Sequence, residues 1–181
     1  MNNIEEKIDR CILLAKNDVS FKQPKPYHDL LMDSWIQHHQ RDMRSALNIK
    51  RIQMRIGKLW EYLLIEFGRF EREGEYGLDI VSKRRRKVVE LKNRYNTDNK
   101  ASRDKNYEKL IQFHDDNPSY ELIYGVINDI TLEGKNQYKL HHGVGIHYLS
   151  GKQLFHHLLG RNRYEQILPI LLEKIDSIYQ P

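Results

Sequence analysis

The sequence predicts an α/β fold with a mixed central β-sheet flanked by helices. Three observations predict it: a long amphipathic helix in the first half of the chain, short apolar segments of strand character after it, and a helix inserted between two of those segments. Helices therefore precede, interrupt and follow a small sheet, for which an α/β sandwich is the economical architecture. The 181 residues suit a single domain, 1–181, with one real core.

The first part of the chain, about residues 1–68, is predicted to be helical. Its strongest segment is NIKRIQMRIGKLWEYLLIEFG, in which Asn48 is a candidate N-cap and Gly68 a candidate stop. The apolar side chains of this segment recur at helical spacing and form one face. The expected helices span 3–16, 34–47 and 48–68.

The sheet-containing core is expected over about residues 69–160. Strands are predicted where apolar runs alternate with polar turns, and the helix between the second and third strands is expected to end at Asn117-Pro118. Ser150 is a candidate cap for the helix after the last strand, and Gly160 is its stop. The expected strands span 76–83, 87–95, 119–129 and 141–150; the expected helices span 101–118, 151–160 and 163–179, the last with Pro169 as a kink or a fresh start.

Composition limits the classes of protein that fit the chain. Lys and Arg number 30 against 25 Asp and Glu, so the net charge of +5 permits nucleic acid as a partner, although a solvated basic surface explains it equally simply. The one cysteine, Cys11, excludes an intramolecular disulfide and a multi-cysteine zinc site. Because no signal peptide and no run of roughly 20 apolar residues is present, a cytoplasmic protein without a membrane partner is expected.

The segment GLDIVSKRRRKVVELKNRY places charged residues among side chains that favour burial. If its two strands pair, Asp79 and Glu90 lie close across them, and Glu90 and Lys92 project from one face. Two carboxylates with a main-chain carbonyl suit Mg²⁺, and a neighbouring lysine can orient or deprotonate an attacking water. The alternative is an exposed ladder of charges, but the apolar flanks argue for a strand that is buried on at least one face.

These motifs resemble the PD-(D/E)XK nuclease superfamily, which has a helix with a glutamate, then G-x-D, then a strand with E-x-K. VVELKNRYNT is similar to the motif region of type II restriction endonucleases, and IHYLSGKQLFHHLLG is similar to the strand–S-G–helix–G ending of several of them. The likeness covers about residues 57–160. Leu78-Asp79 stands where the superfamily name has Pro-Asp, a position at which the proline varies.

The resemblance implies a role for each residue of the motif. Asp79, Glu90 and the Leu91 carbonyl are expected to hold Mg²⁺, with Lys92 beside the attacking water. Glu61 on the preceding helix corresponds to an auxiliary carboxylate, although a plain surface charge is an equal alternative at this position. Ca²⁺ is expected to support DNA binding without cleavage, because it accepts the same oxygen ligands in a looser geometry.

Three groups of residues are candidates for contacts with DNA. The loop after the E-x-K strand is rich in amide and basic side chains, which contact base edges and phosphates. On the long helix, an apolar side chain flanked by cations either wedges between base steps or fills a gap against a neighbouring helix. The candidates are Asn93, Arg94, Asn96, Lys100 and Arg103 after the strand, Met54, Arg55 and Lys58 on the helix, and His141 and His142 in a polar turn.

The function expected from these observations is a Mg²⁺-dependent, sequence-specific double-stranded DNA endonuclease of restriction type. A homodimer is expected, because two active sites related by a two-fold axis match a palindromic target. A repair or recombination nuclease, such as a resolvase, is the alternative on the same fold. A non-catalytic DNA-binding module is the third reading, and it is disfavoured because paired carboxylates repel phosphate.

Overall fold

The computed structural model describes residues 2–19, 40–94, 100–129 and 133–174. Within these ranges helices and strands alternate broadly as the sequence predicts. The helices are α1 (Asn2–Asp18), α3 (Gln40–Gly68), α4 (Lys100–Asp116), α5 (Gly151–Leu159) and α6 (Arg161–Lys174). The strands are β1 (Glu71–Arg72), β2 (Ile80–Ser82), β3 (Lys87–Arg94), β4 (Glu121–Asn128), β5 (Asn136–His141) and β6 (Val144–Ser150).

The strands form one six-stranded sheet in the order β1-β2-β3-β4-β6-β5. β3, β4 and β6 run parallel, whereas β1, β2 and β5 join antiparallel to their neighbours. The parallel crossover from β3 to β4 is made by α4, as expected for strands that cannot be joined by a tight turn. The predicted mixed α/β sheet is confirmed.

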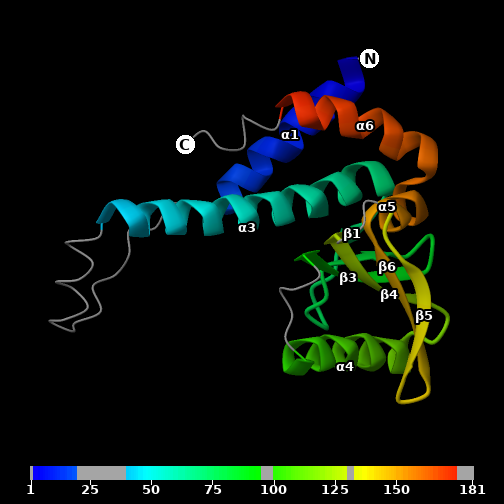
Figure 1. Cartoon of the computed structure of the whole chain (residues 1–181). Coiled ribbons are helices and arrows are strands. Elements are labelled where there is room, and N and C mark those ends of the chain that lie inside the picture. The colour runs from blue at the N-terminus through cyan, green and yellow to red at the C-terminus, as the bar shows by residue number, and fades with distance from the viewer. Residues whose placement is uncertain (1, 20–39, 95–99, 130–132, 175–181) are drawn as a thin grey trace, which may run out of the picture.

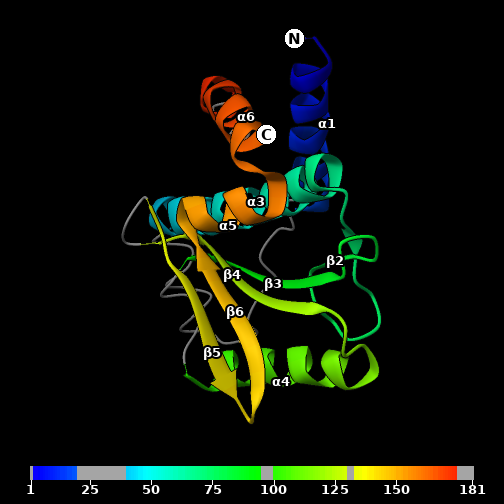
Figure 2. The same cartoon turned by 90° about the vertical axis from the view of Figure 1, so that its right-hand side faces the viewer.

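Helices cover both faces of the sheet (Figures 1 and 2). α4 lies on one face, α3 and α5 lie on the other, and α1 and α6 pack beyond α3 and α5. The alternation of side chains along β3 serves both layers: Val89 and Leu91 join the core beneath α3 and α5, and Val88 joins the core above α4. Each face of the central strands is therefore buried, which explains their near-continuous apolar runs.

Several element boundaries differ from the sequence-based expectation. α3 begins at Gln40, so Asn48 lies inside the helix and is not its cap, whereas Gly68 does end it. Ser150 occupies the N-cap position of α5, but its hydroxyl makes no capping hydrogen bond. α6 runs through Pro169 and does not start afresh there. The expected helix over 34–47 is described only from residue 40 onward, where it is part of α3.

Strand β5 was not predicted. It is the edge strand beside β6, and its side chains are almost all exposed, Tyr138 and Leu140 included. An edge strand with both faces in solvent has no apolar alternation, so periodicity cannot identify it. Over the described ranges, no helix has the length and apolar character needed to span a bilayer.

Candidate active site

The E-x-K strand and the aspartate before it are brought together by antiparallel pairing. β2 and β3 pair with Ile80 opposite Val89, and this register continued by one residue sets Asp79 opposite Glu90. Asp79 Oδ2 accepts a hydrogen bond from the main-chain N–H of Leu91 at 2.6 Å. Residues directly opposite in an antiparallel pair project from the same face, so both carboxylates lie on the α4 side of β3.

Glu90 and Lys92 form an ion pair on that face of β3. The Glu90 side chain is 4% exposed and that of Lys92 is 22% exposed. The second carboxylate oxygen, Glu90 Oε2, is buried and has no hydrogen-bond partner among the residues described. A buried acceptor without a partner costs about 1–3 kcal/mol, so this oxygen offers a position that a cation would satisfy.

The electrostatics of Glu90 show how closely the charged groups are packed. Burial raises the pKa of the Glu90 carboxyl above its ordinary value, and the negative charge of Asp79 raises it further. The ammonium groups of Lys92 and Lys109 act in the opposite direction. Because the ionised form of Glu90 is disfavoured in this way, a divalent cation bound beside it would stabilise the charged carboxylates strongly.

Lys109 enters the site from α4 and was not predicted from the sequence. Its Nζ donates a hydrogen bond to the Gly77 carbonyl at 2.8 Å, in the loop that leads to Asp79. The contact depends on how α4 packs across the sheet, so no local pattern identifies it.

The loop before Asp79 is organised by Glu73, a second residue that the sequence reasoning missed. Its carboxylate accepts the main-chain N–H groups of Glu75 at 2.7 Å, Tyr76 at 3.0 Å and Leu78 at 3.1 Å. The Glu73 N–H in turn donates to the Asp79 carbonyl at 3.3 Å. One side chain therefore holds the backbone of the loop that carries Asp79.

Glu61 on α3 interacts electrostatically with Asp79. Its side chain is 13% exposed, and its carboxylate accepts from Lys58 Nζ at 2.7 and 2.9 Å. Burial raises the pKa of the Glu61 carboxyl; the Lys58 hydrogen bond opposes that shift, and repulsion from Asp79 adds to it. Glu61 is therefore mostly buried and in electrostatic contact with Asp79.

The predicted metal ligand Leu91 lies in β3 between these residues, with its side chain in the core. Only its main chain is therefore available to a cation. Asp79, Glu90, Lys92 and the Leu91 backbone thus lie together along one stretch of β3, and Glu61 on α3 is within electrostatic reach of Asp79.

The residues expected to contact DNA on α3 fall into different environments. Met54 is 53% exposed, so it does not fill a gap in the core. Arg55 is 4% exposed, which corrects the expectation that it contacts DNA, since a buried guanidinium does not reach a duplex. Lys58 is partly exposed and is engaged by Glu61.

The residues expected to contact DNA after the E-x-K strand also differ from one another. Asn93 is half-buried and engaged within the protein: its amide nitrogen donates to the Gln53 carbonyl at 3.1 Å, and its Oδ1 accepts from Asn128 at 2.9 Å. Arg94 is the last residue of β3, and the structure describes its backbone but not its side chain. Asn96 lies outside the described residues. Lys100 and Arg103 lie in the first turn of α4, the former exposed and the latter half-buried.

The basic turn at 83–86 and the turn at 141–142 lie away from the carboxylates. Lys87 starts β3, so the basic turn is about 17 Å along the strand from Lys92 at 3.3 Å per residue. His141 packs its ring against Tyr107 at 4.9 Å, and His142 adopts a positive φ of 51° in the turn between β5 and β6. Neither turn brings a side chain to Glu90.

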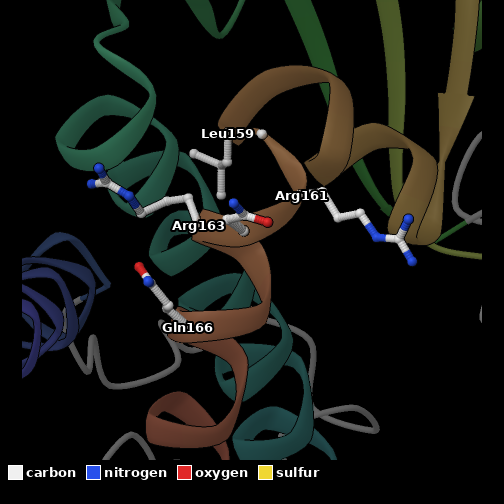
Figure 3. A pocket seen from close by; sticks show the side chains of 6 residues that line it. Leu159, Arg161, Arg163 and Gln166 are labelled. Atoms are coloured by element: carbon white, nitrogen blue, oxygen red, sulfur yellow. The ribbon is translucent and has the colours of Figure 1, made fainter.

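A surface pocket at the junction of α5 and α6 is separate from this site (Figure 3). It is lined by Leu159, Gly160, Arg161, Asn162, Arg163 and Gln166. Figure 3 shows Arg161 and Arg163 pointing away from one another, so their guanidinium groups do not converge on one anion. The cluster on β3 is therefore the candidate active site.

One family model matches most of the chain. The family model of the Eco47II restriction endonuclease matches residues 27–162, a stretch that contains Glu61, Asp79, Glu90 and Lys92. No match to the chain was found among curated proteins or among solved structures. The mixed six-stranded sheet with its flanking helices is a restriction-endonuclease-like fold. The chain belongs to the Eco47II restriction endonuclease family, a family of restriction-type nucleases, as the resemblance of its motifs to type II restriction endonucleases implies.

Proposed function

We propose that the protein is a Mg²⁺-dependent, type II endonuclease that recognises a specific sequence in double-stranded DNA and hydrolyses its phosphodiester bonds. The observation that carries the proposal is Glu90 Oε2, a buried carboxylate oxygen without a hydrogen-bond partner in the described part of the chain, next to Asp79 and Lys92. Buried carboxylates with perturbed electrostatics are enriched at functional sites, where a bound cation or a reacting phosphate interacts with them. Membership of a restriction endonuclease family supports DNA as the substrate.

The donor set fits Mg²⁺. Asp79, Glu90 and the Leu91 carbonyl would hold the ion, because hard oxygen ligands from one or two carboxylates are what Mg²⁺ prefers. When bound, Mg²⁺ supplies a Lewis acid beside the scissile phosphate. The two carboxylates supply the negative charge that this ion needs, and the Leu91 N–H keeps the Asp79 carboxylate turned toward β3.

Lys92 has two tasks in this proposal. Its ammonium offsets the charge of Glu90 and opposes the rise in the pKa of that carboxyl that burial causes. Because it is the more exposed member of the pair, it can also orient the attacking water and offset the negative charge that grows on the phosphate. Glu61, already coupled electrostatically to Asp79, is assigned as an auxiliary carboxylate for the same water.

DNA is proposed to approach over Met54 and Lys58 on α3 and over the start of α4, where Lys100 and Arg103 can contact phosphates. A homodimer is proposed, because cutting both strands of a palindromic site requires two active sites in two-fold relation. The dimer is expected to form or to tighten on the target duplex.

Incubation of the untagged protein with phage DNA and Mg²⁺ tests the proposal. Discrete fragments are expected, and Ca²⁺ in place of Mg²⁺ should give a stable complex without cleavage. A smear would replace the restriction reading by a repair or nonspecific nuclease. Intact DNA under every divalent ion would leave a DNA-binding module and overturn the catalytic assignment.

A further inference from the structure

Three potential metal ligands that are far apart in the sequence lie close together at the sheet. Glu121 is the first residue of β4, His147 lies in β6 and His157 lies in α5. One ligand atom from each lies within 4.8 Å of the other two. Glu121 Oε1 is 2.6 Å from His147 Nδ1 and 2.9 Å from His157 Nε2.

This group lies on the face of the sheet opposite the carboxylates of the candidate active site. Glu121 and His147 alternate with side chains that face α4 and share their face with Ile123 and Leu149, which join the core beneath α5. Glu90 shares its face with Val88, which packs toward α4. The His147 side chain is 4% exposed, whereas those of Glu121 and His157 are 24% and 27% exposed, so solvent reaches the group at Glu121 and His157.

Lys87 contacts the same His157 nitrogen and Glu121 carboxylate that a metal ion would use. Its Nζ is 2.6 Å from His157 Nε2 and 3.0 Å from Glu121 Oε2. The ammonium requires His157 Nε2 to accept, but the Glu121 carboxylate beside it requires the same nitrogen to donate. One imidazole nitrogen cannot do both at once.

The far nitrogen of His147 has the partner that a metal-bound histidine needs. His147 Nε2 lies 2.7 Å from the Asn136 Oδ1 acceptor. A proton on Nε2 leaves the Nδ1 lone pair free to point at Glu121 and His157. A metal-ligating histidine almost always donates its other N–H to such an oxygen, which fixes its tautomer.

We propose that Glu121, His147 and His157 bind a divalent transition-metal ion of the Zn²⁺ type, in competition with the Lys87 ammonium. Two imidazole nitrogens and one carboxylate oxygen suit Zn²⁺ and leave a fourth position for water, whereas Mg²⁺ prefers oxygen ligands alone. Lys87 is 17% exposed on a flexible stem and can turn to solvent when the ion enters. The ion would join β4 and β6 to α5 and hold that helix on the sheet.

Zn²⁺ titration of the untagged, chelator-treated full chain tests the site, followed by calorimetry and by the shift in melting temperature. The background is the Asp79→Ala/Glu90→Ala double variant, which removes the proposed Mg²⁺ ligands on the other face. One Zn²⁺ per chain and a raised melting temperature are expected on this background. Co²⁺ in place of Zn²⁺ should give the visible absorption of a tetrahedral nitrogen and oxygen site.

Single substitutions on that background assign the ligands. His147→Ala and His157→Ala should each weaken Zn²⁺ binding at least about tenfold, and Asn136→Ala should weaken it by roughly tenfold or more. His156→Ala is the matched control, since this neighbour on α5 is half-buried but stands outside the group, and it should bind as the background does. Circular dichroism of each variant without metal shows that it has folded.

Lys87→Met separates a metal site from a network of ion pairs. Removal of the competing ammonium should tighten Zn²⁺ binding if the proposal is right. Equal affinity in Lys87→Met and in the background, or the absence of Zn²⁺ binding in both, would overturn it. Binding that survives in both His147→Ala and His157→Ala would also overturn it. Because the background lacks Asp79 and Glu90, none of these results depends on nuclease activity.

Discussion

The carboxylate of Asp79 is held against β3 by the main-chain N–H of Leu91, at 2.6 Å from Oδ2. The residue that donates this bond lies between Glu90 and Lys92, so a side chain from a loop is locked to the strand that carries the other two charged groups. The bond also removes one acceptor position of Asp79 and leaves its other oxygen for a cation. This relationship makes the effect of particular substitutions predictable.

Asp79→Asn is expected to abolish cleavage with little effect on folding. An asparagine side-chain oxygen can still accept from the Leu91 N–H, but it lacks the charge that a divalent ion requires. Single-turnover cleavage should fall by about 10²-fold or more, while affinity for target DNA measured in Ca²⁺ should stay within about tenfold of wild type. Near-normal cleavage by this variant would remove Asp79 from the reaction.

The raised pKa of Glu90 leads us to expect that metal-free protein becomes less stable as the pH rises above 4.5. Because its pKa in the folded state is raised above 4.5, the folded state binds more protons than the unfolded state between 4.5 and that raised value. The free energy of unfolding should therefore fall as the pH rises through this window. Urea unfolding as a function of pH measures it.

Glu90→Gln supplies the control for that measurement. Glutamine does not titrate, so the slope should flatten in this variant. Added Mg²⁺ should restore stability to wild type at neutral pH and not to Glu90→Gln. Identical pH profiles for the two proteins would show that Glu90 ionises in the folded state as it does in the unfolded chain.

Glu73 is expected to act as a positioning residue for Asp79. Glu73→Ala removes the acceptor of three main-chain N–H groups in the loop. The cleavage rate at saturating Mg²⁺ should drop about tenfold, and the Mg²⁺ concentration for half-maximal rate should rise, because a loosened ligand binds the ion more weakly. Glu75→Ala, in the same loop and exposed, is the matched control and should change neither quantity.

Met54 is expected to contact DNA and not to pack within the protein. Met54→Ala should leave the melting temperature nearly unchanged, because the side chain is more than half exposed. If Met54 wedges between base steps, a fluorescent base analogue in the target should report less unstacking with the variant. A clearly lowered melting temperature with unchanged DNA distortion would assign Met54 to packing instead.

The parts of the site that were predictable from sequence depend on local geometry. Register and alternation along one antiparallel pair place Asp79, Glu90 and Lys92 together, and both follow from spacing. Lys109 and Glu73 were missed because their contacts arise from the packing of α4 and the folding of a loop. Arg55 was misassigned because its burial depends on what packs against α3.

The rest of the fold divides between local and long-range features in the same way. The central strands carry apolar runs and were predicted, whereas β5 lies at the edge with exposed side chains and was not. The group of Glu121, His147 and His157 joins three elements whose adjacency follows only from strand order. Of the two adjacent histidines on α5, His157 joins this group and His156 does not, a difference that sequence spacing alone does not give.

The central claim is that the buried carboxylate on β3 belongs to a metal-dependent phosphodiester hydrolysis site. Single-turnover cleavage of phage DNA in excess Mg²⁺, by wild type and by Glu90→Gln side by side, tests it most directly. The account predicts discrete fragments from the wild type and no cleavage by the variant, although both bind the same fragments in Ca²⁺. Cleavage by Glu90→Gln at a rate near that of the wild type would contradict it.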